Sequence, residues 1–151
     1  MTEIPLKQRI SDEMKAALRA GAKARLGIIR LILAAVKQRE VDERISLDDT
    51  QTLAVMDKMV KQRRDSISQY QAAQRQDLAD QESYEIGILH EFMPSALSEP
   101  EIDAMIDAAF INVGVTSAKD MGKVIAILKP QMQGRADMGK VSGKVKSRLG
   151  S

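Results

Sequence analysis

The sequence predicts an all-α protein, with a long, hairpin-like N-terminal helical part followed by a small three-helix C-terminal domain. Apolar residues recur at steps of three and four along most of the 151 residues. Glycines and prolines that stop helices, such as Gly21, Pro94 and Pro130, separate the periodic segments. The alternation typical of a strand is confined to residues 111–115, where Gly114 interrupts it. We therefore expect a helix end and a loop there.

The first two helices are expected between residues 6 and 44. An apolar stripe with a four-residue repeat opens the first helix and consists of Leu6, Ile10, Met14 and Leu18. Gly21 is the expected C-cap of this helix. The second helix is expected over about residues 23–44, and its centre, residues 28–36, is apolar nearly all round. Because such a helix is normally packed between neighbours, we expect it to be enclosed.

Two further helices are expected before Pro94. Ser46, followed by Asp49 three residues later, forms an imperfect capping box that opens the third helix. The seam of this helix alternates steps of three and four and consists of Leu53, Met56, Val60, Arg63, Ile67 and Tyr70. It fits both an antiparallel helical hairpin and a dimeric coiled coil, and it is too short to decide between them. A fourth helix over about residues 78–92 ends at Pro94.

The segment from Pro94 to Pro100 is the expected domain boundary, because it holds two prolines and two serines and the charge changes there. Residues 1–94 contain fifteen bases and fifteen acids, and residues 95–112 contain four acids and no base. Residues 113–151 contain eight bases and two acids. The sequence thus predicts an N-terminal helical domain over 1–94 and a small basic helical domain over 95–151.

Three short helices are expected in the second domain. The first opens at a capping box that begins with Ser98, and it stops at Gly114. The next opens near Ser117 and is closed by Pro130. Asp137 is the expected N-cap of the last helix, whose buried stripe would be Met138, Val141, Val145 and Leu149.

Composition argues against most catalytic and metal sites. The chain has no Cys and one His, which removes disulfides, thiolate ligands and two-His zinc sites. His90 and Glu91 begin a zincin-like string, but Pro94 stands where the second His is needed. Residues 134–140 resemble a phosphate-binding P-loop, but Val141 follows its lysine in place of Ser or Thr. We expect no catalytic residue, no metal and no cofactor.

The bases of the C-terminal domain are the candidate nucleic-acid contacts, and they are Lys119, Lys123, Lys129, Arg135, Lys140, Lys144, Lys146 and Arg148. The four-residue repeat of Lys140, Lys144 and Arg148 places them on one strip of the last helix. We expect this strip to lie in water. The helix N-termini near Ser117 and Asp137 would add backbone N–H donors for phosphate. A surface that only keeps the protein soluble is the alternative.

No targeting segment is expected. The N-terminus lacks the apolar region of a secretory signal peptide. The longest apolar stretch, Leu26 to Val36, has 11 residues and contains Arg30. A helix needs about 20 apolar residues to span a bilayer. We therefore expect no membrane partner and a cytoplasmic location.

Several strings together resemble the YqeY family of small bacterial proteins: residues 30–35 (RLILAA), 61–66 (KQRRDS), 92–102 (FMPSALSEPEI), 120–124 (DMGKV) and 134–137 (GRAD). The C-terminal segment of that family is similar to the tail domain of the B subunit of the glutamine-dependent aminoacyl-tRNA amidotransferase. The resemblance implies an all-helical, two-part architecture and a link with tRNA, because that tail serves tRNA recognition. Lys123, Arg135 and Lys140 match basic helices of the tail.

Three functions follow as hypotheses. The first is a non-catalytic accessory protein of aminoacyl-tRNA metabolism that binds tRNA or other structured RNA through phosphate contacts. The second is a protein–protein adaptor for an aminoacyl-tRNA synthetase or amidotransferase, which exposed apolar residues such as Met59 or Leu78 would support. The third, a carbon–nitrogen ligase with glutamine as amido-N donor, rests on the resemblance alone, which transfers no catalytic residue.

Overall fold

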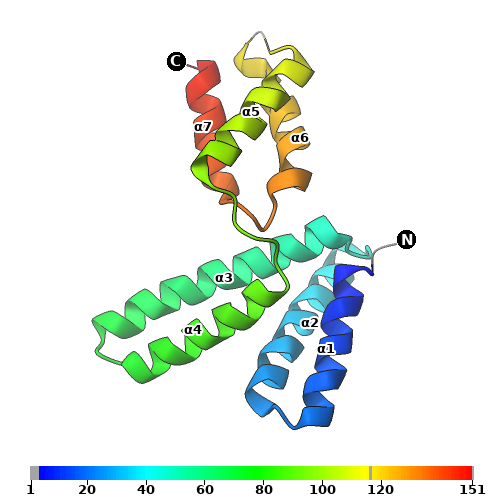
Figure 1. Cartoon of the computed structure of the whole chain (residues 1–151), viewed down its shortest axis with the longest axis vertical. Coiled ribbons are helices and arrows are strands. Elements are labelled where there is room, and N and C mark those ends of the chain that lie inside the picture. Colours follow the sequence, from blue (N-terminus) through cyan, green and yellow to red (C-terminus); the bar gives the residue numbers. More distant parts are fainter. Residues whose placement is uncertain (1–3, 116, 151) are drawn as a thin grey trace. The chain divides into compact units, whose positions relative to one another are not determined.

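The computed structural model describes residues 4–115 and 117–150, and over these residues the chain is all-α, as predicted. The regular elements are α-helices and one short 3-10 turn, and the only β feature in the described ranges is an isolated bridge between Gln133 and Ala136. The backbone contacts divide the chain into two compact units, Met1–Pro94 and Ser95–Ser151. The coloured ribbon in Figure 1 follows the chain through both units.

The described residues of unit 1, 4–94, form four helices, which are α1 (Leu6–Ala20), α2 (Lys23–Glu43), α3 (Asp49–Ala72) and α4 (Gln76–Glu91). α1 packs beside α2, and α3 packs beside α4 as a long hairpin (Figure 1). The core of the unit is built from large side chains without solvent exposure, among them Ile10, Ile29, Ile32, Met56 and Leu89. Antiparallel pairing within the chain therefore accommodates the seam of the third predicted helix.

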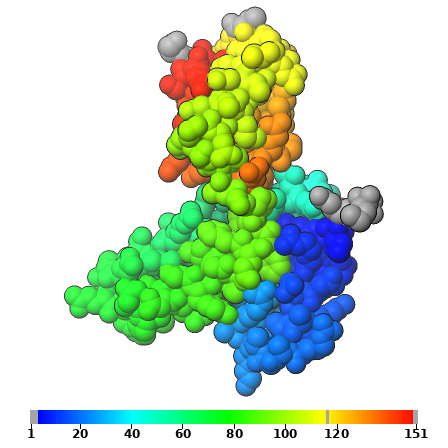
Figure 2. All heavy atoms as spheres, in the orientation of Figure 1, coloured from blue at the N-terminus to red at the C-terminus, as the bar shows by residue number. Residues whose placement is uncertain are grey.

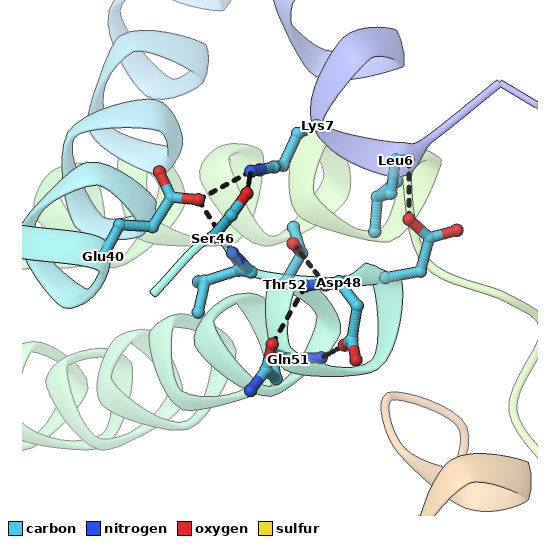
Figure 3. Close-up of polar contacts among 9 residues, drawn as sticks. Leu6, Lys7, Glu40, Ser46, Asp48, Gln51 and Thr52 are labelled. Carbon is cyan, nitrogen blue, oxygen red and sulfur yellow. Dashed lines mark hydrogen bonds and ion pairs between the residues drawn. The ribbon is translucent and has the colours of Figure 1, made fainter. Parts of the chain in front are cut away.

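The ends of α1 and α3 show how local chemistry sets the helix limits. Gly21 ends α1 with φ 67°, a left-handed conformation that glycine adopts without steric cost. Asp48, not Ser46, is the N-cap of α3, and it forms a capping box with Gln51. The predicted Ser46 box is therefore wrong. Ser46 instead accepts a 3.0 Å hydrogen bond from the Lys7 ammonium, as Figure 3 shows.

Two burial predictions in unit 1 are also wrong. Leu18 is exposed, and Ala17 takes the buried position near the end of α1. A four-residue step advances about 40° beyond a full helical turn, so a strict four-residue stripe rotates out of the core. The expectation that α2 is enclosed on all sides fails as well, because Leu31 and Val41 remain exposed.

Unit 2 contains α5 (Glu99–Val113), the 3-10 turn η1 (Ala118–Asp120), α6 (Met121–Met132) and α7 (Met138–Gly150). Ser98 and Glu101 form the predicted capping box at the start of α5. α5 ends at Gly114 with φ 69°, so residues 111–115 are a helix end and loop, as predicted. The core side chains of the unit are Ile102, Ile106, Ala109, Val124, Leu128, Met132, Val141 and Val145.

Pro130 does not close its helix, contrary to the prediction. It lies inside α6, which continues to Met132. Proline lacks the N–H that would bond to the preceding turn, and its ring crowds that turn. Because Pro130 lies two residues before the end of α6, the disturbance is limited to the last turn of the helix. The N–H of Gln133 still donates to the Lys129 carbonyl at 2.9 Å, which completes the last turn.

Candidate nucleic-acid interface

The eight candidate bases occupy η1, both later helices of unit 2 and the turn between them. Six of them are exposed residues: Lys119, Lys123, Lys129, Lys140, Lys146 and Arg148. Lys144 and Arg135 are half-buried. The Arg148 side chain is 33% exposed. The candidates therefore differ in how freely they meet solvent, and their neighbours differ too.

Lys144 and Arg148 lie against a row of carboxylates on α5. The Lys144 ammonium contacts the Glu99 carboxylate and lies 3.0 Å from Asp103. The Arg148 guanidinium contacts Asp107 and lies 3.6 Å from Asp103. The hydrogen bond from Lys144 to Glu99 is the main reason that the pKa of Lys144 is raised, and its bond to Asp103 adds to the effect.

The structure therefore corrects the expected strip. Val141 and Val145 are buried, as predicted, but two of the three strip cations pair with acids of α5 and do not lie free in water. The two helices lie beside each other in the sphere view of unit 2 (Figure 2). The signal that sequence reasoning missed is the four-residue repeat of the α5 acids, Glu99, Asp103 and Asp107, which matches the repeat of the bases.

Two other candidates have local roles. The Arg135 guanidinium donates to the Ser95 carbonyl at 3.0 Å, and the Arg135 carbonyl accepts from the Leu97 N–H at 2.8 Å. Arg135 thus fastens the start of unit 2 to the turn before α7. Lys123 lies 3.9 Å from Asp120 within the same part of the chain, a loose pair whose lysine is 74% exposed.

Four candidates, Lys119, Lys129, Lys140 and Lys146, have no carboxylate within ion-pair distance among the described residues. They do not share one helix face. On α7, Lys140 lies on the same strip as Lys144. Lys146 follows Lys144 by two residues and therefore lies about 200° further around the helix than that strip. The structure brings Lys144 and Arg148 of α7 together against the acids of α5. It leaves the other four lysines as separate exposed charges.

The helix N-termini expected to receive phosphate are already capped. The Ser117 hydroxyl accepts the Lys119 N–H at 3.3 Å. The Asp137 carboxylate accepts the Gly139 N–H at 2.9 Å and the Lys140 N–H at 3.4 Å. Asp137 is the N-cap of α7, as predicted, but its charge and its bonds oppose a phosphate at that position.

Unit 1 holds a polar recess of about 280 Å³ lined by charged side chains of three helices. Arg25 bridges two of its carboxylates, with 3.2 Å to Glu13 and 2.6 Å to Glu91. These bonds raise the pKa of Arg25, and the bond to Glu91 has the larger effect. Arg9 lies over the Phe92 ring, 5.9 Å from its centroid. The recess is an electrostatic junction of α1, α2 and α4, in which Arg25 pairs with Glu13 and Glu91 and the carboxylate of Asp12 accepts a 2.8 Å hydrogen bond from Gln8.

Neither a metal centre nor a membrane-spanning helix is present in residues 4–115 and 117–150. No group of three His, Asp or Glu side chains in these ranges is arranged to hold a metal ion. None of their helices combines the length and the hydropathy needed to cross a bilayer. His90 lies exposed in the last turn of α4, as predicted for a helix-terminal residue.

Comparison with known proteins identifies the family. The profile described as "Yqey-like protein" matches residues 7–149. The chain belongs to the YqeY family. The family expected from the short motifs is therefore confirmed, and the match extends over both units.

Curated relatives of this YqeY-family chain are fungal proteins named "Altered inheritance of mitochondria protein 41, mitochondrial". The relative from Kluyveromyces lactis is 31% identical over 100 residues, which cover 64% of the chain and 54% of the relative. The Vanderwaltozyma polyspora protein is 31% identical over 68% of the chain and 57% of its own length. The Pyrenophora tritici-repentis protein is 28% identical over 95% of the chain and 80% of its own length. The chain spans about half the length of the first two relatives.

These names contradict the cytoplasmic location expected from the sequence, because each describes a mitochondrial protein. The expectation was based on the absence of an apolar secretory segment. Mitochondrial transit peptides are amphipathic and Arg-rich, so that absence has no bearing on them. The relatives are fungal, and the bacterial character implied by the resemblance is not confirmed.

Proposed function

We propose that this YqeY-family chain is a non-catalytic accessory protein that binds structured RNA, tRNA included, through phosphate contacts of unit 2. The observation that carries the proposal is the set of exposed lysines without a carboxylate partner in the described part of the unit, Lys119, Lys129, Lys140 and Lys146. A lysine ammonium binds phosphate as a point charge, and its affinity for RNA is lost when a carboxylate neutralises it.

The type of contact follows from the composition of the chain. Aromatic residues make up 3% of the sequence, so stacking on splayed bases has little to build on. Recognition through backbone and shape needs cations and not aromatics. The resemblance to the amidotransferase tail supports tRNA as the RNA partner. Lys144 and Arg148 then have a structural part, since they hold α7 on α5.

The experiment is a titration of the full chain with an unmodified tRNA transcript at several salt concentrations. Charge reversal of two unpaired lysines, Lys140→Glu with Lys146→Glu, should weaken binding and lower the salt slope by about two. The matched control is Lys15→Glu with Lys58→Glu, which changes the same charge on exposed lysines of unit 1. Absence of binding at low salt, or equal loss in both double variants, would contradict the proposal.

A second function, the protein adaptor, is favoured by a different observation. Met59, expected to be exposed, is buried, and Leu78 is half-buried. Exposed apolar residues occur on α2 instead, where Leu31 is 50% and Val41 is 59% exposed, and also at single positions of other helices, such as Leu18 on α1 and Ile111 on α5. A synthetase or an amidotransferase is the proposed partner. A pull-down with the full chain that recovers such an enzyme after nuclease treatment tests this function.

A further inference from the structure

Within unit 1, α2 has a largely apolar face that no described residue of the unit covers. Six of its exposed residues alternate steps of three and four, and they are Ala24, Gly27, Leu31, Ala34, Gln38 and Val41. These residues are called the α2 seam below. The alternation is the heptad pattern by which one helix packs against another. α2 thus uses one face for the core of unit 1 and keeps a second face with helix-pairing spacing.

A row of positive charges borders this seam. Lys23, Arg30 and Lys37 follow one another at seven-residue intervals, and Arg44 stands at the same interval on the C-cap of α2. All four are exposed, and no carboxylate lies within ion-pair distance of any of them among the described residues. Each base directly precedes a seam position or, for Arg44, the exposed residue Ile45. These four bases are called the α2 ridge.

We propose that the α2 seam and ridge form a docking surface for an acidic amphipathic helix of another protein. The apolar side chains of that helix would pack on Leu31 and Val41, and carboxylates at seven-residue intervals would face the ridge. α2 has 21 residues, so the surface is about 31 Å long and suits a helix of several turns. The inference rests on the adaptor function, for which it names the partner chemistry.

Charge argues against a second copy of the chain as the occupant. Two α2 helices packed antiparallel would bring ridge against ridge, which repels. Packed in parallel, the ridge would face the other flank of the seam, which consists of Ile28, Ala35 and Asp42. Asp42 is the only acid there and already accepts a 2.8 Å bond from Gln38. A foreign acidic helix supplies the carboxylates that a second copy lacks.

The apolar seam also favours a helix over a nucleic acid. A phosphate backbone would neutralise the ridge but would leave Leu31 and Val41 in water. An amphipathic helix covers both features at once, and burial of apolar surface supplies most of the affinity of such contacts. RNA binding on this face is therefore an alternative result of the test.

The experiment selects partners for the full-length chain from a displayed library of amphipathic helical peptides. The peptides carry apolar residues at heptad seam positions, and their flanking positions are randomised among Glu, Gln and Lys. We expect enrichment of peptides with Glu along one flank. Their affinity should fall about tenfold or more for Leu31→Glu and for the triple change Lys23→Glu, Arg30→Glu, Lys37→Glu. The triple variant should gain affinity for the peptides with Lys flanks.

Control variants separate surface effects from misfolding. Leu31 is half-exposed and Glu suits a helix, so far-ultraviolet circular dichroism of Leu31→Glu should match the wild type. Lys58→Glu with Arg64→Glu changes exposed bases of α3 and should leave peptide affinity unchanged.

Four results would overturn the inference: no enrichment, enrichment without a preference for acids, a dimer of the chain that Leu31→Glu dissociates, or tRNA binding that only the triple variant abolishes. A pull-down that recovers a synthetase equally well with wild type and Leu31→Glu would keep the adaptor function and reject this surface.

Discussion

The guanidinium of Arg63 on α3 lies 3.6 Å from the carboxylate of Glu85 on α4. Their side chains are 13% and 14% exposed, so the pair lies largely inside the hairpin. Arg63 also donates to the Met59 carbonyl at 3.3 Å, while its Nε is buried without a hydrogen-bond partner in the described part of the chain. The charged position in the apolar seam of α3 is therefore half of an ion pair between α3 and α4.

The first prediction concerns the pH dependence of this pair. Burial raises the pKa of Glu85 above its ordinary value, although Arg63 acts in the opposite direction. The folded chain then holds the Glu85 proton more tightly than the unfolded chain does. As pH rises through the folded pKa, ionisation of Glu85 costs folding free energy. We expect the wild type to lose stability relative to Glu85→Gln as pH rises above the ordinary glutamate pKa of about 4.3.

Urea denaturation of both proteins at several pH values measures this difference. Gln does not ionise, and every other group that titrates equally in the two proteins cancels from the difference between their unfolding free energies. The pH dependence of that difference therefore reports on Glu85. A stability difference that stays flat with pH, or that favours the wild type more as pH rises, would show that Arg63 outweighs burial at this position.

The second prediction has the opposite sign and concerns Glu40 (Figure 3). Its carboxylate accepts a hydrogen bond of 2.6 Å from the Lys7 ammonium and one of 2.8 Å from the Leu47 N–H. These bonds lower the pKa of Glu40, and the bond from Lys7 has the larger effect. These bonds stabilise the folded chain fully at pH values above the pKa that Glu40 has in the unfolded chain. The stabilisation is lost as pH falls through the pKa that Glu40 has in the folded chain. Glu40→Gln should be less stable than the wild type at neutral pH, and the two should converge in acid.

Glu43→Gln is the matched control for Glu40→Gln. Glu43 lies on the same helix, and within residues 4–115 and 117–150 its one ion pair is the within-helix pair with Arg39. Exposed pairs of this kind contribute little. Thermal unfolding of both variants across the pH range should show the pH-dependent loss for Glu40→Gln alone. An equal loss in Glu43→Gln would point to a general charge effect on α2.

Local signals predicted the helices of this chain well. Gly21, Ser98 with Glu101, and Asp137 act as caps where the sequence placed them, because capping depends on bonds within a few residues. The N-cap of α3 was misassigned between Ser46 and Asp48. Both residue types suit an N-cap, and the Ser46 hydroxyl instead accepts a hydrogen bond from the distant Lys7, a tertiary contact that the local sequence does not show.

The candidate site was harder to predict than the helices. Spacing correctly placed Lys144 and Arg148 on one strip of α7. It did not show that this strip faces the acids of α5, because the rotation of one helix against another is set by tertiary packing. The α2 seam was overlooked for a related reason. A helix that is apolar nearly all round indicates burial but does not show which face the core takes.

The third prediction compares two isoleucines of α5. Ile106 has no solvent exposure and lies in the core of unit 2, whereas Ile111 is 82% exposed. Ile106→Ala should destabilise the chain by about 2–5 kcal/mol, through lost apolar burial and the cavity that remains. Ile111→Ala should change stability by less than about 0.5 kcal/mol. Chemical denaturation followed by circular dichroism measures both.

The outcome distinguishes the folded core from a surface that needs a partner. A large loss for Ile111→Ala in the isolated chain would mean that Ile111 is covered in solution. A small loss for Ile106→Ala would mean that unit 2 repacks easily around a missing side chain, which its eight-residue core does not suggest.

The fourth prediction concerns Asp103, the carboxylate shared by Lys144 and Arg148. Asp103→Asn removes the one carboxylate that both cations contact, while each keeps a second partner on α5, so stability should fall slightly at low salt and the loss should shrink at high salt. The same change removes one negative charge from beside two cations, which keep only Glu99 and Asp107 as partners, so tRNA should bind more tightly to Asp103→Asn than to the wild type. Asp65→Asn changes an exposed acid of α3 that has no ion pair with any described residue, and it should alter neither property. Unchanged tRNA affinity in Asp103→Asn would mean that Lys144 and Arg148 lie away from any RNA path, whatever the role of the unpaired lysines.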